Sequence, residues 1–170
     1  MNQVVFSGRV AADPVLRYDR NGGSVVNFTL LQSIGDRLTR LQCVMFRNAE
    51  MTNADAETAK ARALLAEVAA ENGEEPDFSK HTLSRVGYIM DAVRVGHSLT
   101  VSGRVQNNDY STQTNGVQTR TFGVECVVLD FDHNTTRAEA ERILAAQQAR
   151  AEQKAEATAV AEVEHEPAFA

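Results

Sequence analysis

Residues 98–129, SLTVSGRVQNNDYSTQTNGVQTRTFGVECVVL, alternate between apolar and polar side chains on both sides of an Asn-Gly pair. In the first arm, Leu99 and Val101 share one face, and polar side chains fill the other. A period of two is typical of a half-buried strand. Asn115 and Gly116 favour a tight hairpin turn because both tolerate positive φ. The stretch therefore predicts a long β-hairpin with one apolar face.

The second face of this hairpin has the wrong composition for a core. In the first arm it carries Arg104, Gln106, Asn108 and Tyr110. In the return arm the predicted apolar face consists of Phe122, Val124, Cys126 and Val128. Arginine, amides and an aromatic residue on one strand face suit a nucleic-acid surface better than a protein interior.

Three earlier segments also alternate like strands, over residues 3–10, 24–32 and 39–46. In the first, Gly8 indicates a bend of the kind that lets a sheet curl, and Arg9 points away from the apolar face. In the third, Arg40 and Phe46 share the polar face. Arg17 and Tyr18 precede a predicted turn at residues 21–23, and residues 33–38 are expected to form a short loop.

Residues 48–96 change in character and predict helices. The first runs over 53–72, with Asn53 as a cap and Gly73 as a stop. The second runs over 80–95 with Ser79 as its cap, and its apolar side chains recur at helical spacing, which predicts packing on a core. They are Leu83, Val86, Ile89, Met90 and Val93.

The order of elements predicts a mainly β protein. Three strands, a helical segment at 48–96 and two further strands match a five-stranded OB-fold barrel with a helical insertion between strands 3 and 4. This domain is expected to span 1–131. Residues 132–170 form an acidic tail, helical in part or disordered, because few large apolar side chains support a helix there.

Charge is distributed unevenly along the chain. The formal net charge is −6, but residues 1–47 carry six Arg against three Asp, a local charge of +3. The negative charge lies in residues 48–96 and in the tail, and local charge governs the field that a ligand meets. The cysteines, Cys43 and Cys126, are expected to be buried and reduced, although a disulfide is not excluded by the pattern.

Several classes of function find no support in the sequence. No apolar run of membrane-spanning length and no secretory leader pattern occurs, so no membrane partner and a cytoplasmic location are expected. The four histidines are scattered, and neither a metal-binding cysteine spacing nor a phosphate-binding glycine loop is present. We therefore expect neither an enzyme, nor a metal site, nor a cofactor.

The order and spacing of several motifs resemble the bacterial and phage single-stranded DNA-binding proteins. The likeness covers residues 3–47 and about 83–129, with VVFSGRV at 4–10 and LTVSGRV at 99–105 as its main motifs. It implies an OB-fold that binds single-stranded DNA largely without sequence specificity during replication, recombination or repair, as a dimer or tetramer associated with the nucleoid. Residues 48–80 have no counterpart in that family.

The resemblance implies two base-stacking residues. Phe46 stands where the family has a phenylalanine, and Tyr110 stands where it usually has a tryptophan. This chain contains no Trp, and amides replace basic residues on the fourth strand. The residues expected to contact DNA are Arg9, Arg17, Arg40, Phe46, Arg47, Arg104, Gln106, Asn108 and Tyr110.

Each of these residues also has an interpretation that involves no ligand. Phe46 suits core or interface packing equally well, Tyr110 can pack on its hairpin neighbour, and any single arginine can be a solvated charge. Arg120 shares the face of Phe122 and makes a weak candidate. The whole barrel is alternatively an adaptor or assembly module that has lost DNA binding, or an RNA-binding module.

The C-terminus has two interpretations as well. The family's tail ends in acids followed by Pro-Phe and recruits replication and repair proteins. Here that ending is echoed by Glu164, Glu166, Pro167 and Phe169, followed by Ala170. The alternative is an acidic tail that only keeps the protein soluble.

Overall fold

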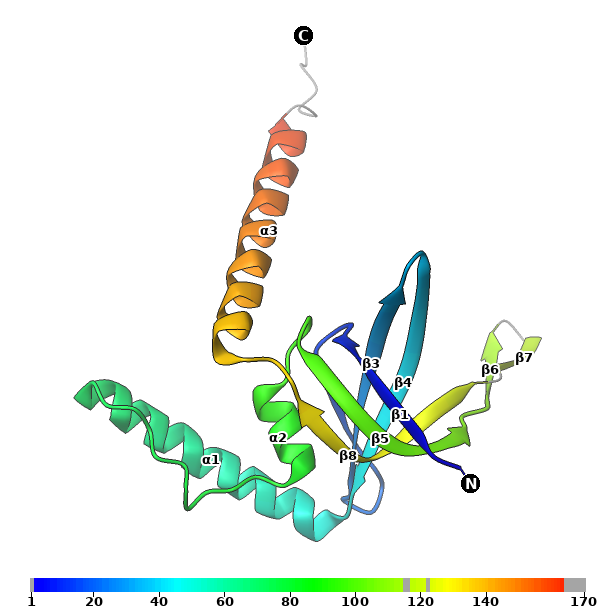
Figure 1. Ribbon diagram of the computed structural model, residues 1–170, viewed down its shortest axis with the longest axis horizontal. Helices are drawn as coiled ribbons and strands as arrows, with labels where there is room; N and C mark the ends of the chain where they lie inside the picture. The colour runs from blue at the N-terminus through cyan, green and yellow to red at the C-terminus, as the bar shows by residue number, and fades with distance from the viewer. Residues whose placement is uncertain (1, 115–116, 122, 164–170) are drawn as a thin grey trace. The chain divides into compact units, whose positions relative to one another are not determined.

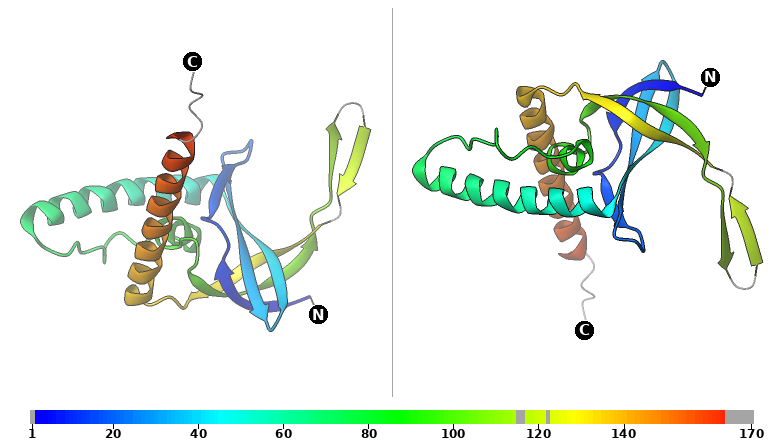
Figure 2. Two further views of the ribbon diagram at one scale, coloured as in Figure 1. Left: turned by 90° about the horizontal axis from the view of Figure 1, so that it is seen from above. Right: turned by 90° about the horizontal axis from the view of Figure 1, so that it is seen from below.

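The computed structural model describes residues 2–114, 117–121 and 123–163, without the side chains of residues 110–114, 117–121 and 155–163. The chain forms two compact units, Met1–Asn134 and Thr135–Ala170. The second unit contains one helix, α3 (Arg137–Val163). Everything that bears on a binding site lies in the first unit, which Figures 1 and 2 show from three directions.

The first unit is built on a closed barrel of five strands. These are β1 (Val4–Val10), β3 (Ser24–Ile34), β4 (Arg37–Arg47), β5 (Ser98–Asn107) and β8 (Val124–His133). Around the barrel the order is β1-β5-β8-β4-β3, and pairing of β1 with β3 closes it. β4 and β8 run parallel, and the other neighbours are antiparallel. A mainly β barrel of five strands is therefore confirmed, and its strand order is compatible with an OB-fold.

The alternating apolar side chains fill the barrel as predicted. Val26 and Leu30 on β3 and Leu99 and Val101 on β5 are fully buried. Cys43 and Cys126 are free thiols in the same core and are register neighbours across β4 and β8. Burial raises the pKa of the Cys43 thiol far above its usual range, and the neighbouring Cys126 raises it further. Both cysteines therefore act as small apolar residues.

Two glycines allow neighbouring strands to approach each other closely, Gly8 at the β1–β3 contact that closes the barrel and Gly103 at the β5–β8 contact. A Cβ atom on Gly8 would lie 2.7 Å from the Leu31 carbonyl oxygen, and one on Gly103 would lie 2.2 Å from the Val127 carbonyl oxygen. Both positions are inside strands, and the β5–β8 register shifts between Ser102 and Gly103. Any larger residue at these positions would strike the neighbouring backbone. Glycine therefore permits the close approach, in agreement with the bend predicted from Gly8.

The first half of the barrel differs from the prediction at two loops. Residues 15–18 form an additional strand, β2 (Val15–Tyr18), paired with β3. It was missed because its side chains lie mostly exposed and show no apolar alternation. The predicted loop at 33–38 is wrong, since β3 and β4 continue to a two-residue turn at residues 35–36, where Gly35 has φ of 59°. The tip of this hairpin is exposed, so no apolar pattern marked it as strand.

Two helices lie between β4 and β5. Helix α1 (Ala49–Asn72) begins at Asn48, whose side chain accepts the Met51 backbone N–H, so the predicted cap at Asn53 is wrong. Gly73 ends the helix in a left-handed conformation, as predicted. In Figures 1 and 2, α1 extends away from the barrel on the side opposite the β6–β7 hairpin described below.

Helix α2 (Arg85–Ala92) is shorter than the predicted 80–95. Its N-cap is Ser84, whose side chain accepts the Gly87 backbone N–H, so Ser79 is not the cap. The apolar stripe was predicted correctly, because Val86, Ile89 and Val93 are buried in the barrel core. This helix therefore packs against the barrel with the face that its spacing indicated.

The hairpin of residues 98–129 is interrupted. β5 ends at Asn107, and β6 (Tyr110–Thr114) and β7 (Val117–Thr121) form a separate two-stranded sheet that projects from the barrel in Figure 2. Thr114 pairs with Val117, on either side of the predicted Asn115-Gly116 turn, which lies outside the described residues. Phe122 lies outside them as well. Val124 is 58% exposed, so its predicted place in the core is wrong.

Candidate nucleic-acid interface

One sheet face outside the barrel carries most of the predicted DNA-binding residues. We call outer face the side chains of β1, β2, β3, β4, β5 and β8 that point away from the core. Strand register arranges them in rows across the sheet. The rows are Arg17–Val25–Phe46; Val15–Asn27–Val44–Val127–Arg104; Thr29–Gln42–Glu125–Gln106; and Arg9–Leu31–Arg40.

Phe46 is the exposed aromatic side chain at one end of this face. Its side chain is 57% exposed, although Val44 and Met45 just before it are buried. Packing in the core of this chain is therefore excluded for Phe46. Val25 separates it from Arg17 in the same row. Neighbouring strands lie about 4.8 Å apart, so the arginine side chain is long enough to reach over a ligand that stacks on the ring.

Beside Phe46, the outer face is hollowed. Arg17, Asn27, Gln42 and Asn108 line an open hollow of about 380 Å³, and a smaller one of about 180 Å³ shares the first three residues. Within the described part of the chain, the side chains of Arg17, Asn27 and Gln42 have no hydrogen-bond partner. A cavity with free donors and acceptors is ready to bind a polar ligand.

A buried carboxylate, that of Glu125, lies behind Asn108, which lines the hollow. Glu125 is 6% exposed and accepts hydrogen bonds from Gln106 Nε2 at 2.6 Å and from Asn108 Nδ2 at 2.7 Å. The sequence predicted that both amides contact DNA directly, but it missed the acid that holds them. The available indication was the alternation itself, which places Glu125 on the polar face of its strand between Val124 and Cys126.

Three further predicted arginines surround these features. Arg40 and Arg104 are exposed on the outer face, and the described residues contain no partner for either guanidinium. Arg9 is also exposed, and its Nη1 donates to the Gly96 carbonyl at 2.9 Å. Together with Arg17, they place positive charge along both ends of the face. Such a distribution attracts phosphate despite the negative net charge of the chain.

Arg47 does not belong to this surface. It directly follows Phe46 but points to the helical side of the sheet, where only 8% of the residue is exposed. Its Nε donates to Ser24 Oγ at 3.0 Å, and its Nη1 forms an ion pair with Asp55 on α1. Burial lowers the pKa of the guanidinium, and Tyr18 counteracts this effect. The predicted DNA contact of Arg47 is therefore replaced by a structural role.

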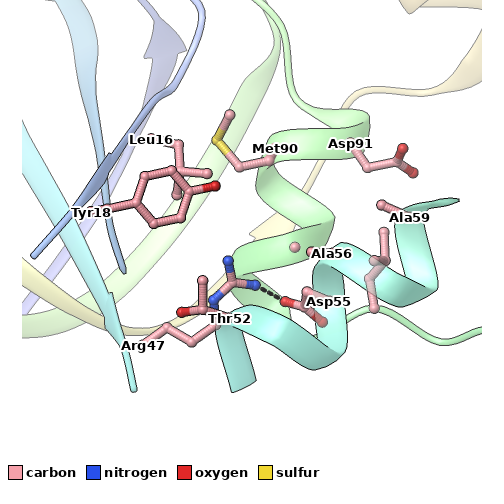
Figure 3. Close-up of a pocket in the computed structure, with 11 residues that line it drawn as sticks. Leu16, Tyr18, Arg47, Thr52, Asp55, Ala56, Ala59, Met90 and Asp91 are labelled. Atoms are coloured by element: carbon pink, nitrogen blue, oxygen red, sulfur yellow. Dashed lines mark hydrogen bonds and ion pairs between the residues drawn. The ribbon is translucent and has the colours of Figure 1, made fainter. Parts of the chain in front are cut away.

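Figure 3 shows the pocket that contains this ion pair, between β2, α1 and α2. Its volume is about 230 Å³, and Leu16, Tyr18 and Met90 form much of its wall. Asp55 also accepts hydrogen bonds from the backbone N–H and the hydroxyl of Ser84. Arg47 and Asp55 in this pocket are thus paired with each other, whereas Arg17, Arg40 and Arg104 on the outer face have no partner among the described residues.

Part of the prediction falls outside the described structure. The backbone of Tyr110 pairs with Thr121 in the β6–β7 hairpin, but its side chain is not described. Glu164, Glu166, Pro167 and Phe169 lie beyond the last described residue, Val163.

The described residues were also compared with the requirements of a metal site and of a membrane-spanning helix, and they meet neither. No group of three or more His, Cys, Asp or Glu side chains there is placed to hold a metal ion. None of the helices in that part of the chain is both long and apolar enough to cross a membrane. No family model matches the sequence. A comparison with curated proteins also finds no match.

Proposed function

We propose that this protein binds single-stranded DNA across the outer face of its barrel, largely without sequence specificity. The observation that carries this proposal is Phe46, a largely exposed aromatic ring on the outer face, with free arginines on the same face. The barrel is accordingly assigned as an OB-fold, with α1 and α2 as a helical insertion. The chain is then a divergent relative of the bacterial and phage single-stranded DNA-binding proteins.

Base stacking supplies the first part of the binding energy. An aromatic platform contributes about 1–3 kcal/mol per stacked base and accepts every base, because all bases have a π-face. Phe46 is the described platform, and Tyr110 is proposed as a second on the projecting hairpin. Phe46 shares a register row with Arg17, which lines the hollow, and Tyr110 follows Asn108 by two residues in the chain.

Arginine–phosphate contacts supply the second part. Arg17, Arg40 and Arg104 have no partner within the described structure, so binding phosphate breaks no existing ion pair. Guanidinium groups bind phosphate oxygens in a bidentate manner and also stack on bases. Each neutralised phosphate releases counterions, which makes the affinity fall as salt rises.

The placement of the hollow on the barrel supports the same conclusion. It lies on β3 and β4, the second and third barrel strands, between β2 in the first connection and the hairpin in the last. These strands and these two connections are the binding surface of OB-folds in general. Of the two ligand classes that this surface takes, oligonucleotides suit the exposed phenylalanine and arginines best.

The partners proposed beyond DNA rest on exposed apolar groups and on the tail. Val5 is 65% exposed and Leu129 is 63% exposed, and both suit burial in a homo-oligomer, a dimer or tetramer. Avidity would then raise the affinity of each subunit. The tail residues 164–169 are proposed to recruit replication or repair proteins. Light scattering tests the subunit count, and removal of residues 162–170 should leave DNA binding intact or stronger.

Titration of a fluorescent oligo-dT at several salt concentrations tests the proposed function. We expect saturable binding whose logarithmic affinity falls linearly with the logarithm of the salt concentration, with a slope of about −0.7 for each phosphate contacted. Substitution Tyr110→Ala should weaken binding if that ring stacks on a base. Absence of binding at low salt would instead favour the adaptor module, and salt-independent binding would contradict the arginine–phosphate mechanism.

A further inference from the structure

We propose that the hollow on the outer face selects bases that carry an amino group at position 4 of a pyrimidine or position 6 of a purine, cytosine or adenine, over thymine at one position of the bound strand. This inference rests on the proposed function and refines it. Stacking alone treats all bases alike, whereas the polar groups of the hollow do not. The residues that carry the preference are Asn108 and the buried Glu125 behind it.

The first step is the orientation of the Asn108 amide. Its Nδ2 donates to Glu125 Oε2 at 2.7 Å. An ionised carboxylate has only acceptors, so the NH2 group must be the end of the amide that faces it. Asn108 also lines the hollow, and its backbone N–H is anchored on the Gly123 carbonyl at 2.9 Å. The carbonyl oxygen Oδ1 has no hydrogen-bond partner within the described residues and is therefore the acceptor that Asn108 can offer to a ligand.

Glu125 prevents the amide from turning over. It is 6% exposed and is held on its other oxygen by Gln106 Nε2 at 2.6 Å. Rotating the Asn108 amide would place its carbonyl oxygen against a buried carboxylate, which replaces a charge-assisted hydrogen bond by repulsion. For the same reason, the side-chain carbonyl oxygen of Gln106 is the end of its amide that faces away from Glu125. Asn108 Oδ1 is thus a hydrogen-bond acceptor of fixed orientation at the hollow.

A fixed acceptor distinguishes pyrimidines at position 4 of the ring. Cytosine has an N4 amino group there, which donates, and adenine has an equivalent N6 amino group, whereas thymine has the O4 acceptor. Asn108 Oδ1 therefore binds cytosine or adenine and repels thymine in the same pose. The opposite wall of the hollow carries the free guanidinium of Arg17 and the free amides of Asn27 and Gln42, which supply donors to the remaining acceptors of the base.

Phe46 is placed to stack a base next to this hollow. Val44 and Phe46 lie on the same face of β4, and Asn27 pairs with Val44. Asn27 is therefore the diagonal neighbour of Phe46, at a separation of about 7–8 Å that an aromatic side chain spans. The negative charge of Glu125 also disfavours a phosphate in the hollow. Bases are thus directed into it, and phosphates toward the exposed arginines.

The experiment compares oligo-dC and oligo-dT of equal length by fluorescence anisotropy. Wild-type protein should bind oligo-dC about three- to tenfold more tightly, the range that one net hydrogen bond supplies. Asn108→Ala should abolish this ratio by weakening the binding of oligo-dC, while the affinity for oligo-dT stays the same or rises. The matched control is Asn107→Ala, because Asn107 is the exposed neighbour on β5 and does not line the hollow.

Glu125→Gln tests the positioning role separately. A carboxamide at position 125 donates as well as accepts, so the Asn108 amide is no longer held in one orientation. The dC-to-dT ratio should then approach one, and the affinity for oligo-dT should rise because a negative charge is removed. Circular dichroism confirms that each variant is folded.

The outcomes separate this inference from the proposed function. If the wild type binds oligo-dT as tightly as oligo-dC or more tightly, or if Asn108→Ala retains the preference, the base-selection inference is wrong while DNA binding stands. If neither oligonucleotide binds, both proposals fail together.

Discussion

Arg17 and Arg47 are alike in sequence context and opposite in structure. Both stand near the end of a strand beside an aromatic residue, Tyr18 and Phe46 respectively. Arg17 lies on the outer face with no partner in the described residues, whereas the guanidinium of Arg47 is buried against Ser24 and Asp55. An arginine is thus available for a ligand only when the fold leaves the hydrogen bonds of its guanidinium unmade.

The same contrast extends to the two sides of the barrel. On the helical side, the pocket between β2, α1 and α2 contains the ion pair of Arg47 with Asp55. On the outer face, the hollow contains an arginine and two amides without partners. Polar groups of the first kind stabilise the fold, and those of the second kind are available for binding. Substitutions on the helical side should therefore lower stability, and substitutions on the outer face should lower affinity.

The largest effect is expected from Arg47→Ala. Removing one member of a buried ion pair leaves Asp55 as an uncompensated buried charge, which costs about 3–5 kcal/mol. Chemical denaturation measures this loss in the free energy of unfolding. Arg17→Ala is the matched control and should change stability by less than about 0.5 kcal/mol, as surface substitutions do. Equal stability losses in the two variants would remove the distinction between the two arginines.

The next effect is on affinity. Phe46→Ala should weaken binding of oligo-dT by about 1–3 kcal/mol, because the stacking platform is lost. Stability should change little, since more than half of the ring is exposed. Leu64→Ala on α1, where the side chain is 64% exposed, is the control and should leave the affinity unchanged. An unaltered affinity in Phe46→Ala would mean that the ring does not contact DNA.

A smaller effect is expected from Arg17→Ala on the salt dependence. Loss of one phosphate contact should reduce the magnitude of the slope of logarithmic affinity against logarithmic salt concentration by about 0.7. Arg85→Ala provides the control, because Arg85 on α2 is already paired with Asp130. The slopes come from titrations of each variant at four or more salt concentrations. A slope unchanged by Arg17→Ala would place the phosphate elsewhere.

The smallest effect concerns pH and again involves the helical side. Tyr88 Oη lies 2.9 Å from His133 Nδ1, and His133 Nε2 lies 3.1 Å from His97 Nδ1. Burial lowers the pKa of His133 below its ordinary value of 6.5, and His97 lowers it further. The unfolded chain therefore takes up more protons than the folded protein below pH 6.5. The contribution of His133 to the free energy of unfolding is complete above that pH and is lost as the solution is acidified.

Denaturation at several pH values between 5 and 8 measures this contribution. The decline on acidification should be reduced in His133→Gln, which does not titrate. DNA affinity should not follow the same pH profile, because no histidine lines the hollow on the outer face. An identical pH dependence in wild type and His133→Gln would assign the proton uptake to another group.

The five strands of the barrel could be predicted from the sequence. Period-two alternation located all five of its strands, because each has one face buried in a common core. The helical stripe of Val86, Ile89 and Val93 was equally visible, since it packs against that core. What local patterns did not show was β2, whose residues lie mostly on the surface and owe their pairing to β3.

The candidate site was accessible only in part. Alternation placed Arg40, Phe46 and Arg104 on one face, which the structure confirms. The burial of Arg47 was not visible, because it depends on Asp55 of α1, which is in turn hydrogen-bonded to Ser84 at the start of α2. Glu125 was missed because alternation marks it only as a polar position and shows neither its burial nor its hydrogen bonds with Gln106 and Asn108.

We propose that DNA binds to the outer face and makes no contact with the helical side of the barrel. Two-dimensional 15N–1H spectra that resolve the arginine Nε–H groups test it most directly, with assignments from Arg17→Lys and Arg47→Lys. On addition of an oligonucleotide, the Arg17 signal should shift while that of Arg47, held on Ser24 Oγ, stays in place. A shift of the Arg47 signal with Arg17 unchanged would contradict the account.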